Sequence, residues 1–208
     1  MSIRRVRRAA AIAVALLLAG GGAQAQDTTA VRDLPPAGYG TLGQEDVAIT
    51  FQTGSFSIQV IPLDEWVLRL LSPDTYRSFH SLREMMEPRV QEVAARYGLR
   101  RPTLFLVTFF GQRDQARFEP DLLTITSQNR FFRPQEILPR SAQWNGRQLN
   151  QRETASAIYV FGDGIQLREP FTVSYDTFSS NRWEQVLRLL DRERARALAR
   201  AADSQREP

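Results

Sequence analysis

The feature that most constrains the fold is an apolar run of eight residues, Thr103–Phe110, which lies between a proline and a glycine. Its shortness and its β-branched and aromatic residues predict a β-strand. Side chains alternate along a strand, so both faces would be apolar: Leu104, Leu106 and Phe110 on one, Phe105, Val107 and Phe109 on the other. Burying these six side chains contributes roughly 9–18 kcal/mol before chain entropy is subtracted. We therefore expect a central strand that is covered on both faces.

The N-terminus has the layout of a secretory signal peptide. Arg4, Arg5, Arg7 and Arg8 precede the apolar run Ala9–Ala19, and Ala23-Gln24-Ala25 supplies an A-x-A cleavage site. The run is about half of the roughly 20 residues that a membrane span needs. We expect residues 1–25 to be removed after Ala25. This predicts a periplasmic or secreted protein without a membrane span.

Removal of the leader changes the meaning of the charge. The four leader arginines account for the whole formal charge of +4, and 23 of the 27 basic residues remain against 23 acidic ones. The mature chain would be neutral, so nothing in its net charge favours nucleic acid as a partner. All basic residues are arginine, which excludes lysine chemistry, and the absence of cysteine leaves a hydrophobic core as the source of stability.

The first half of the expected domain, residues 41–200, combines a hairpin with helices. Residues 26–40 contain prolines and glycines and predict a flexible linker. Asp46–Thr53 and Ser55–Ile61 alternate around a tight Thr53-Gly54 turn, which predicts an N-terminal β-hairpin. Apolar residues at helical spacing then predict a helical hairpin over residues 63–97, with a kink or break at Pro88. This insertion would cover one face of the central strand.

The second half is rich in strand signals. The predicted strands are Leu122–Thr126, Ala155–Phe161 and Phe171–Tyr175, and Trp144-Asn145-Gly146 predicts a two-residue hairpin turn. Residues 181–200 predict a C-terminal helix, and its charged part from Asp191 on is expected to be solvated. Residues 201–208 are expected to form a disordered tail. The fold class expected is mainly β with added helices (α+β): an antiparallel, immunoglobulin-like β-sandwich.

The segment Thr103–Tyr175 resembles the telokin-like, immunoglobulin-type sandwich domains of exported bacterial proteins of unassigned function. The resemblance rests on a few positions: Phe118-Glu119-Pro120, Leu122–Thr126, Phe132-Arg133-Pro134, Ala157, Tyr159, Phe161, Leu167 and Phe171–Tyr175. The N-terminal hairpin and the helices depart from that pattern. The resemblance implies a fold and no catalytic residues.

Residues that could carry chemistry are few. His80 is the one histidine and there is no cysteine. A catalytic triad would have to be built on His80, and a zinc site would lack the several histidine or cysteine ligands that it needs. Asp163 and Asp176 could bind calcium, but single aspartates in turns usually form the turn. Asp64-Glu65 or the pair Glu84 and Glu87 could act as acid and base, although helix-end and ion-pair roles suit them better. We therefore expect no enzyme activity, no metal site and no cofactor.

The aromatic residues outside the core pattern are the remaining candidates. Phe131 and Phe132 are adjacent, so one of them should point outward, and Trp144 flanks a turn. Phe131, Phe132 and Trp144 are thus a possible surface for contact with another envelope or secreted protein. One alternative is a carrier of a small apolar ligand in a pocket lined by Phe105, Phe109 and Trp66. The other is a carboxylate-based envelope hydrolase that uses Glu84 or Asp64.

Overall fold

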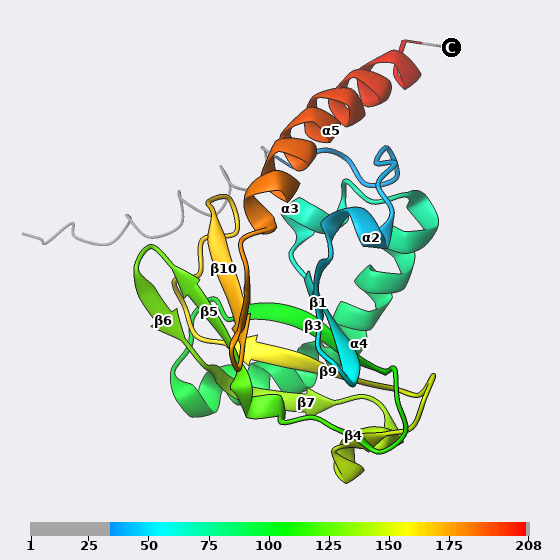
Figure 1. Ribbon diagram of the computed structural model, residues 1–208. Coiled ribbons are helices and arrows are strands. Elements are labelled where there is room, and N and C mark those ends of the chain that lie inside the picture. Colours follow the sequence, from blue (N-terminus) through cyan, green and yellow to red (C-terminus); the bar gives the residue numbers. More distant parts are fainter. Residues whose placement is uncertain (1–33, 207–208) are drawn as a thin grey trace, which may run out of the picture. The chain divides into compact units, whose positions relative to one another are not determined.

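A computed structural model describes residues 34–206 (Figure 1). The predicted signal peptide, residues 26–33 of the predicted linker and residues 207–208 lie outside the described residues. The helices are α2 (Gln44–Val47), α3 (Glu65–Leu68), α4 (Pro73–Tyr97) and α5 (Trp183–Ser204), with 3₁₀ turns η1 (Pro120–Leu122) and η2 (Ala142–Gly146). The strands are β1 (Ile49–Gln52), β2 (Phe56–Pro62), β3 (Thr103–Gly111), β4 (Ala116–Arg117), β5 (Leu123–Ser127), β6 (Arg130–Phe132), β7 (Pro134–Pro139), β8 (Gln148–Leu149), β9 (Thr154–Phe161), β10 (Phe171–Tyr175) and β11 (Phe178–Ser180).

The fold is a mixture of helices and antiparallel sheets, as the α+β part of the prediction requires. One sheet has the order β1-β2-β3-β9-β7 and a second has the order β11-β10-β5-β6; β4 and β8 form a separate pair. The chain passes from the second sheet into the first between β6 and β7, through the single residue Arg133. At the opposite side β11 lies beside β1.

The central strand predicted from the sequence is confirmed. β3 is the middle strand of the first sheet and pairs with β2 and β9, so the Ala155–Phe161 run is also an interior strand. The predicted N-terminal hairpin is present as the β1–β2 pair, although Val47 ends a short helix and does not belong to the strand. Two-sided apolar patterns need two covering layers, and the fold supplies both.

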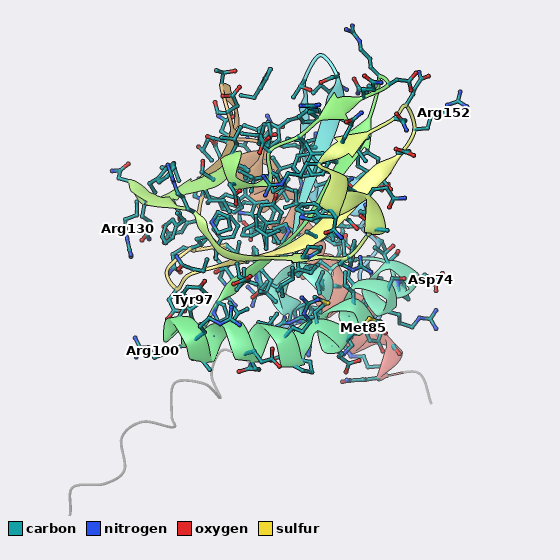
Figure 2. The ribbon with its side chains drawn as sticks, turned by 90° about the horizontal axis from the view of Figure 1, so that it is seen from below. Asp74, Met85, Tyr97, Arg100, Arg130 and Arg152 are labelled. Carbon is teal, nitrogen blue, oxygen red and sulfur yellow. The ribbon has the colours of Figure 1, made fainter. Side chains whose placement is uncertain are left out.

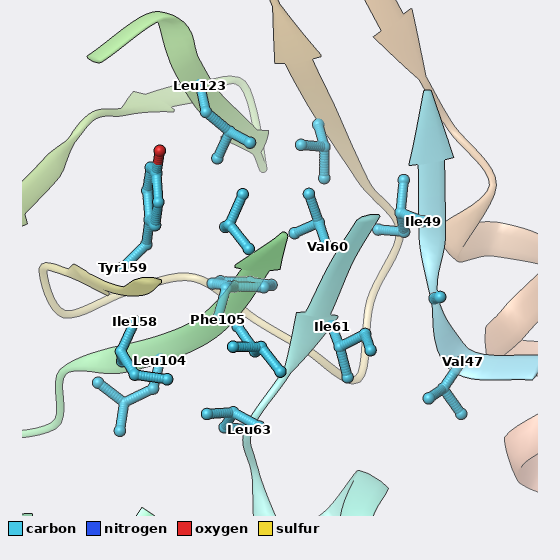
Figure 3. Close-up of a cluster of buried hydrophobic side chains, with 14 of the residues drawn as sticks. Val47, Ile49, Val60, Ile61, Leu63, Leu104, Phe105, Leu123, Ile158 and Tyr159 are labelled. Carbon is cyan, nitrogen blue, oxygen red and sulfur yellow. The ribbon is translucent and has the colours of Figure 1, made fainter. Parts of the chain in front are cut away.

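The two faces of β3 are covered by different layers. Helix α4 runs along one side of the strands, with Met85 and Tyr97 on it (Figure 2). On the opposite side Tyr159 points towards Leu123 of β5, while Leu104 and Ile158 lie on the side of Leu63 (Figure 3). The Phe105 ring meets Phe171 of β10 at 6.0 Å, so the second sheet covers the face of β3 that α4 does not.

The helical insertion differs from its expected form. α3 is a single turn and α4 is continuous for 25 residues, with Pro88 inside it. Pro88 was expected to kink or divide the helix, yet the helix is not divided there. Pro88 lies on the exposed side of α4, where water can hydrate the carbonyl of Glu84 that loses its N–H partner. Gly98, at a φ of 66°, ends the helix as the sequence indicates.

The C-terminal helix is longer and better packed than expected. It runs from Trp183 to Ser204, so residues 201–204 of the expected tail are helical. Glu193, expected on a solvated surface, is only 2% exposed; its carboxylate accepts hydrogen bonds from the N–H (3.0 Å) and Oγ1 (2.9 Å) of Thr41 and pairs with Arg200. Arg200 also donates to the carbonyl of Tyr39 at 2.8 Å. Residues 39–41, at the end of the expected linker, are therefore held against α5.

Candidate functional site

The three aromatic residues proposed from the sequence have different surroundings. Phe131 is 60% exposed, whereas Phe132 and Trp144 are buried. Trp144 does not flank a hairpin turn: it lies within the 3₁₀ turn η2, and its ring packs on Phe109 and Phe118 at 5.8 and 5.4 Å. Of the three, only Phe131 offers its ring to solvent. The sequence-based prediction of a contact surface is therefore wrong for Phe132 and Trp144, and only Phe131 is exposed as expected.

Phe131 is carried by a tight hairpin that the sequence did not reveal. β5 and β6 pair with the register Ile125↔Phe132, Thr126↔Phe131 and Ser127↔Arg130, which leaves Gln128 and Asn129 as a two-residue turn. Both turn residues have positive φ, 50° and 58°, as a type I′ turn requires. Gln-Asn is a weaker signal for this turn than Asn-Gly, so the pattern alone did not identify it. The alternation along β6 sends Phe132 inward and Phe131 outward.

Two guanidinium groups flank these rings. Arg133 lies over the Phe131 ring at 5.7 Å from its centroid, and Arg130 lies over the Phe132 ring at 5.2 Å. Both distances are within the range in which a cation is attracted to an aromatic face. Figure 2 shows Arg130 at the periphery of the molecule. We call Arg130, Phe131 and Arg133 the hairpin surface.

A second group of candidates is brought together by α3 and α4. His80 Nδ1 lies 2.9 Å from Glu65 Oε1, and His80 Nε2 lies 3.5 Å from Glu84 Oε1. Arg69 donates from Nε to Glu65 Oε2 at 2.9 Å, and the Tyr76 ring stacks on the His80 ring at 5.1 Å. Both imidazole nitrogens therefore face carboxylates, and neither is directed at an open site. This carboxylate–histidine cluster joins α3 to α4, and its imidazole is engaged by Glu65 and Glu84.

The cluster makes stability depend on pH through Glu65. Burial alone would raise the Glu65 pKa, but hydrogen bonds from Arg69 and His80 outweigh it and lower the pKa below the ordinary 4.5. A lowered folded-state pKa contributes stability that is complete above the unfolded pKa and is lost as pH falls through the folded value. We expect Glu65→Gln to cost about 1 kcal/mol at neutral pH and much less well below pH 4.5.

Urea unfolding of Glu65→Gln and wild type at both pH values measures this difference. The matched control is Glu92→Gln, an exposed carboxylate on α4, which should change stability little at either pH. An equal cost for Glu65→Gln at both pH values would show that the ionised carboxylate does not stabilise the fold.

The other carboxylates proposed from the sequence have local structural partners. Asp64 accepts the N–H of Trp66 at 2.8 Å and so caps α3. Asp163 accepts the N–H groups of Arg100 and Arg101 at 3.0 and 2.8 Å, and these bonds lower its pKa. Asp176 has a φ of 50° in the turn between β10 and β11. Glu87 accepts from Gln91, one turn along α4, so it does not form an acid–base pair with Glu84.

The aromatic residues proposed to line an apolar pocket are part of the core. Phe105 and Phe109 are fully buried and point towards the second sheet, not towards the helices. Trp66 is buried on α3, where Arg168 lies over its ring at 5.5 Å. The three side chains therefore do not share one cavity between the helices and the sheet.

The structure adds a polar pocket of about 380 Å³ beside the edge strand β7. Its charged lining residues are Asp121, Glu136 and Arg147. They are separated by 11 or more positions in the sequence, and no motif connects them, so sequence reasoning had no signal for this site. Within residues 34–206, no group of three or more His, Asp or Glu side chains is arranged to hold a metal ion.

Comparisons with known protein families, with curated proteins and with solved structures find no match for this chain. The function must therefore be argued from the geometry of these sites.

Proposed function

We propose that this chain is an exported, non-enzymatic binding module, an immunoglobulin-like β-sandwich that contacts a partner protein through its hairpin surface. The observation that carries this proposal is the exposure of Phe131: 60% of a large aromatic side chain is open to solvent beside the guanidinium of Arg133. Exposing an aromatic ring forgoes the roughly 1.5–3 kcal/mol that its burial would contribute. Aromatic and arginine side chains are also those that dominate binding energy at protein interfaces.

The hairpin surface is held rigid by its neighbours. The adjacent Phe132 is buried, and a side chain at Gly164 would meet Arg130 at 3.1 Å, so the loop at Gly164 packs against the hairpin. The two-residue turn leaves little freedom at the hairpin tip. A rigid surface loses less conformational entropy when it binds. The arrangement thus favours recognition of a preformed partner surface.

The chemistry of the hairpin surface selects its partner. Arg133 places positive charge over the exposed Phe131 ring, and Arg130, which lies over Phe132, adds a second positive charge to the same hairpin. This suits an acidic segment that carries an apolar side chain. β6 is an edge strand of its sheet, so such a segment could also pair with its backbone. We therefore propose an acidic segment of another envelope or secreted protein as the partner. Export rests on the signal-peptide pattern of residues 1–25.

The alternatives have less support. An apolar ligand carrier would need Phe105 and Phe109 to line a cavity, but both are fully buried among other rings. A carboxylate hydrolase would need Glu84 or Asp64 beside a reacting bond. Asp64 caps α3, and Glu84 lies beside His80 on the helix surface. Within residues 34–206, no helix has both the length and the apolar composition to cross a membrane.

The proposal is tested by purifying the full chain from its own cells and measuring its mass under native conditions. We expect a protein of fixed stoichiometry to remain bound to wild type. The variants Phe131→Ser and Arg133→Glu should lose it while they stay as stable as wild type, because both positions are exposed. Phe178→Ser is the matched control, since Phe178 is 42% exposed on another strand. Retention of the partner by both hairpin variants would contradict the proposal.

A further inference from the structure

The polar pocket beside β7 shares no lining residue with the hairpin surface, although Pro134, one of its lining residues, directly follows Arg133. Its lining comes from Tyr97 at the end of α4, Asp121 in η1, Gln135 and Glu136 in β7, Trp144 in η2 and Arg147 just after η2. Its volume of about 380 Å³ is near the lower end of the range of about 300–1,000 Å³ found for small-molecule sites. We infer that this pocket binds a neutral saccharide of one or two sugar rings.

Some of the polar groups of the pocket are already fixed. The Glu136 carboxylate accepts hydrogen bonds from Arg96 Nη1 at 3.2 Å and from the Tyr97 hydroxyl at 3.4 Å. Arg147 Nη1 donates to Glu119 Oε2 at 3.1 Å. These bonds set the directions of the side chains before any ligand arrives. Preorganised polar groups lower the entropy that binding costs.

Two other polar groups remain available. The Asp121 carboxylate and the Gln135 side-chain amide form no hydrogen bond or ion pair within residues 34–206. A carboxylate can accept from two hydroxyls, and an amide both donates and accepts. Adjacent hydroxyls on a sugar ring supply donors and acceptors at matching spacing. Such bonds to an ionised carboxylate are stronger than those between neutral groups.

Trp144 is one of the lining residues, although its side chain is largely buried. Its ring packs edge-on against Phe109, Phe118 and Tyr159, at 5.8, 5.4 and 6.1 Å, which fixes its position at the edge of the pocket. The lining is mostly polar, so a sugar would be held mainly through its hydroxyls and would touch only the small exposed part of the Trp144 side chain. Trp144, expected from the sequence to contact a protein, would on this inference contact a saccharide.

Other ligand classes fit this lining less well. A phosphate or another anion would meet the carboxylates of Asp121 and Glu136, which repel it. An apolar molecule would remove water from Asp121 and Gln135 without replacing its hydrogen bonds. A polyamine would meet the Arg147 guanidinium. A neutral polyhydroxyl ligand avoids all three conflicts.

The inference is tested by ¹⁹F NMR of the full chain labelled with 5-fluorotryptophan. The chain has 3 tryptophans, and Trp66 and Trp183 are not among the lining residues. Glucose, N-acetylglucosamine, cellobiose and chitobiose are titrated to millimolar concentration. We expect at least one of them to shift the Trp144 signal saturably, with that signal assigned by its loss in Trp144→Phe. The signals of Trp66 and Trp183 should stay in place.

Variants then locate the binding site. Asp121→Ala and Gln135→Ala should each weaken saccharide binding by about tenfold, because both side chains are exposed and their loss leaves the fold intact. Glu92→Ala, which removes an exposed carboxylate of α4, should leave the affinity unchanged. The inference is overturned if none of the four sugars shifts the Trp144 signal or if Asp121→Ala binds as well as wild type. It is also overturned if phosphate or spermidine shifts that signal more than any sugar.

Discussion

Phe109→Ala is expected to destabilise the protein by about 3–5 kcal/mol. Phe109 is fully buried at the point where the two sheets and η2 meet. Its ring contacts rings from four other parts of the chain: Phe56 at 5.7 Å, Phe118 at 4.4 Å, Trp144 at 5.8 Å and Tyr175 at 5.8 Å. Removing the ring leaves a cavity bounded by these four, and rigid aromatic neighbours collapse poorly into such a space.

The matched control is Phe110→Ala. Phe110 is the next residue of β3, is only half-buried and points to the opposite face of the sheet. Urea unfolding of both variants gives the two free energies. We expect Phe109→Ala to cost at least twice as much as Phe110→Ala. Equal costs would mean that the two sheets do not depend on this aromatic contact.

Leu82→Asp is expected to cost more than about 4 kcal/mol, enough to unfold much of the protein. Leu82 lies on α4, is 6% exposed and belongs to the single hydrophobic core shared by the helices and both sheets. A carboxylate at this position would lose its hydration within a cluster of apolar side chains. The variant would have to keep the carboxyl protonated or detach α4 from the sheet.

Met85→Asp provides the comparison, because Met85 lies on the same helix and is 71% exposed. This substitution adds the same negative charge to α4, but at a position where the carboxylate stays in water. Circular dichroism and thermal unfolding should show near-wild-type stability for Met85→Asp and loss of the folded state for Leu82→Asp. Folding of Leu82→Asp at the wild-type denaturant midpoint would mean that α4 does not cover the sheet.

The elements that the sequence predicted well are those with strong local patterns. Thr103–Phe110 and Ala155–Phe161 are apolar on both faces, and both are interior strands. The Asp46–Ile61 region alternates around a Thr-Gly turn, and it forms the β1–β2 hairpin. In these segments burial and local preference agree, so the pattern alone is sufficient.

The errors occur where tertiary contacts decide the structure. Asn145-Gly146 is a strong hairpin signal, yet these residues belong to the 3₁₀ turn η2. The same turn carries Trp144, whose ring packs on Phe109 and Phe118. Glu193 lies in a highly charged stretch, but its partner Thr41 is 152 positions away. A local sequence pattern cannot predict a contact between residues so far apart in the chain.

The candidate site was only partly predictable. Adjacent phenylalanines imply that one points outward, and alternation along β6 makes that residue Phe131. The cation–aromatic contacts of Arg130 and Arg133 depend on a hairpin that the sequence did not reveal. The polar pocket could not be predicted, because its residues converge only after η1, η2, β7 and α4 have packed together.

The central claim is that the hairpin surface contacts a protein partner. The most direct measurement places a photoreactive benzoyl-phenylalanine at position 131, or at position 178 as the control, in the full chain in its own cells; both positions are exposed. We expect illumination to give one cross-linked protein from position 131, to give none from position 178, and to fail when Arg130→Glu and Arg133→Glu are added. No adduct from position 131, or the same adduct from both positions, would contradict the claim.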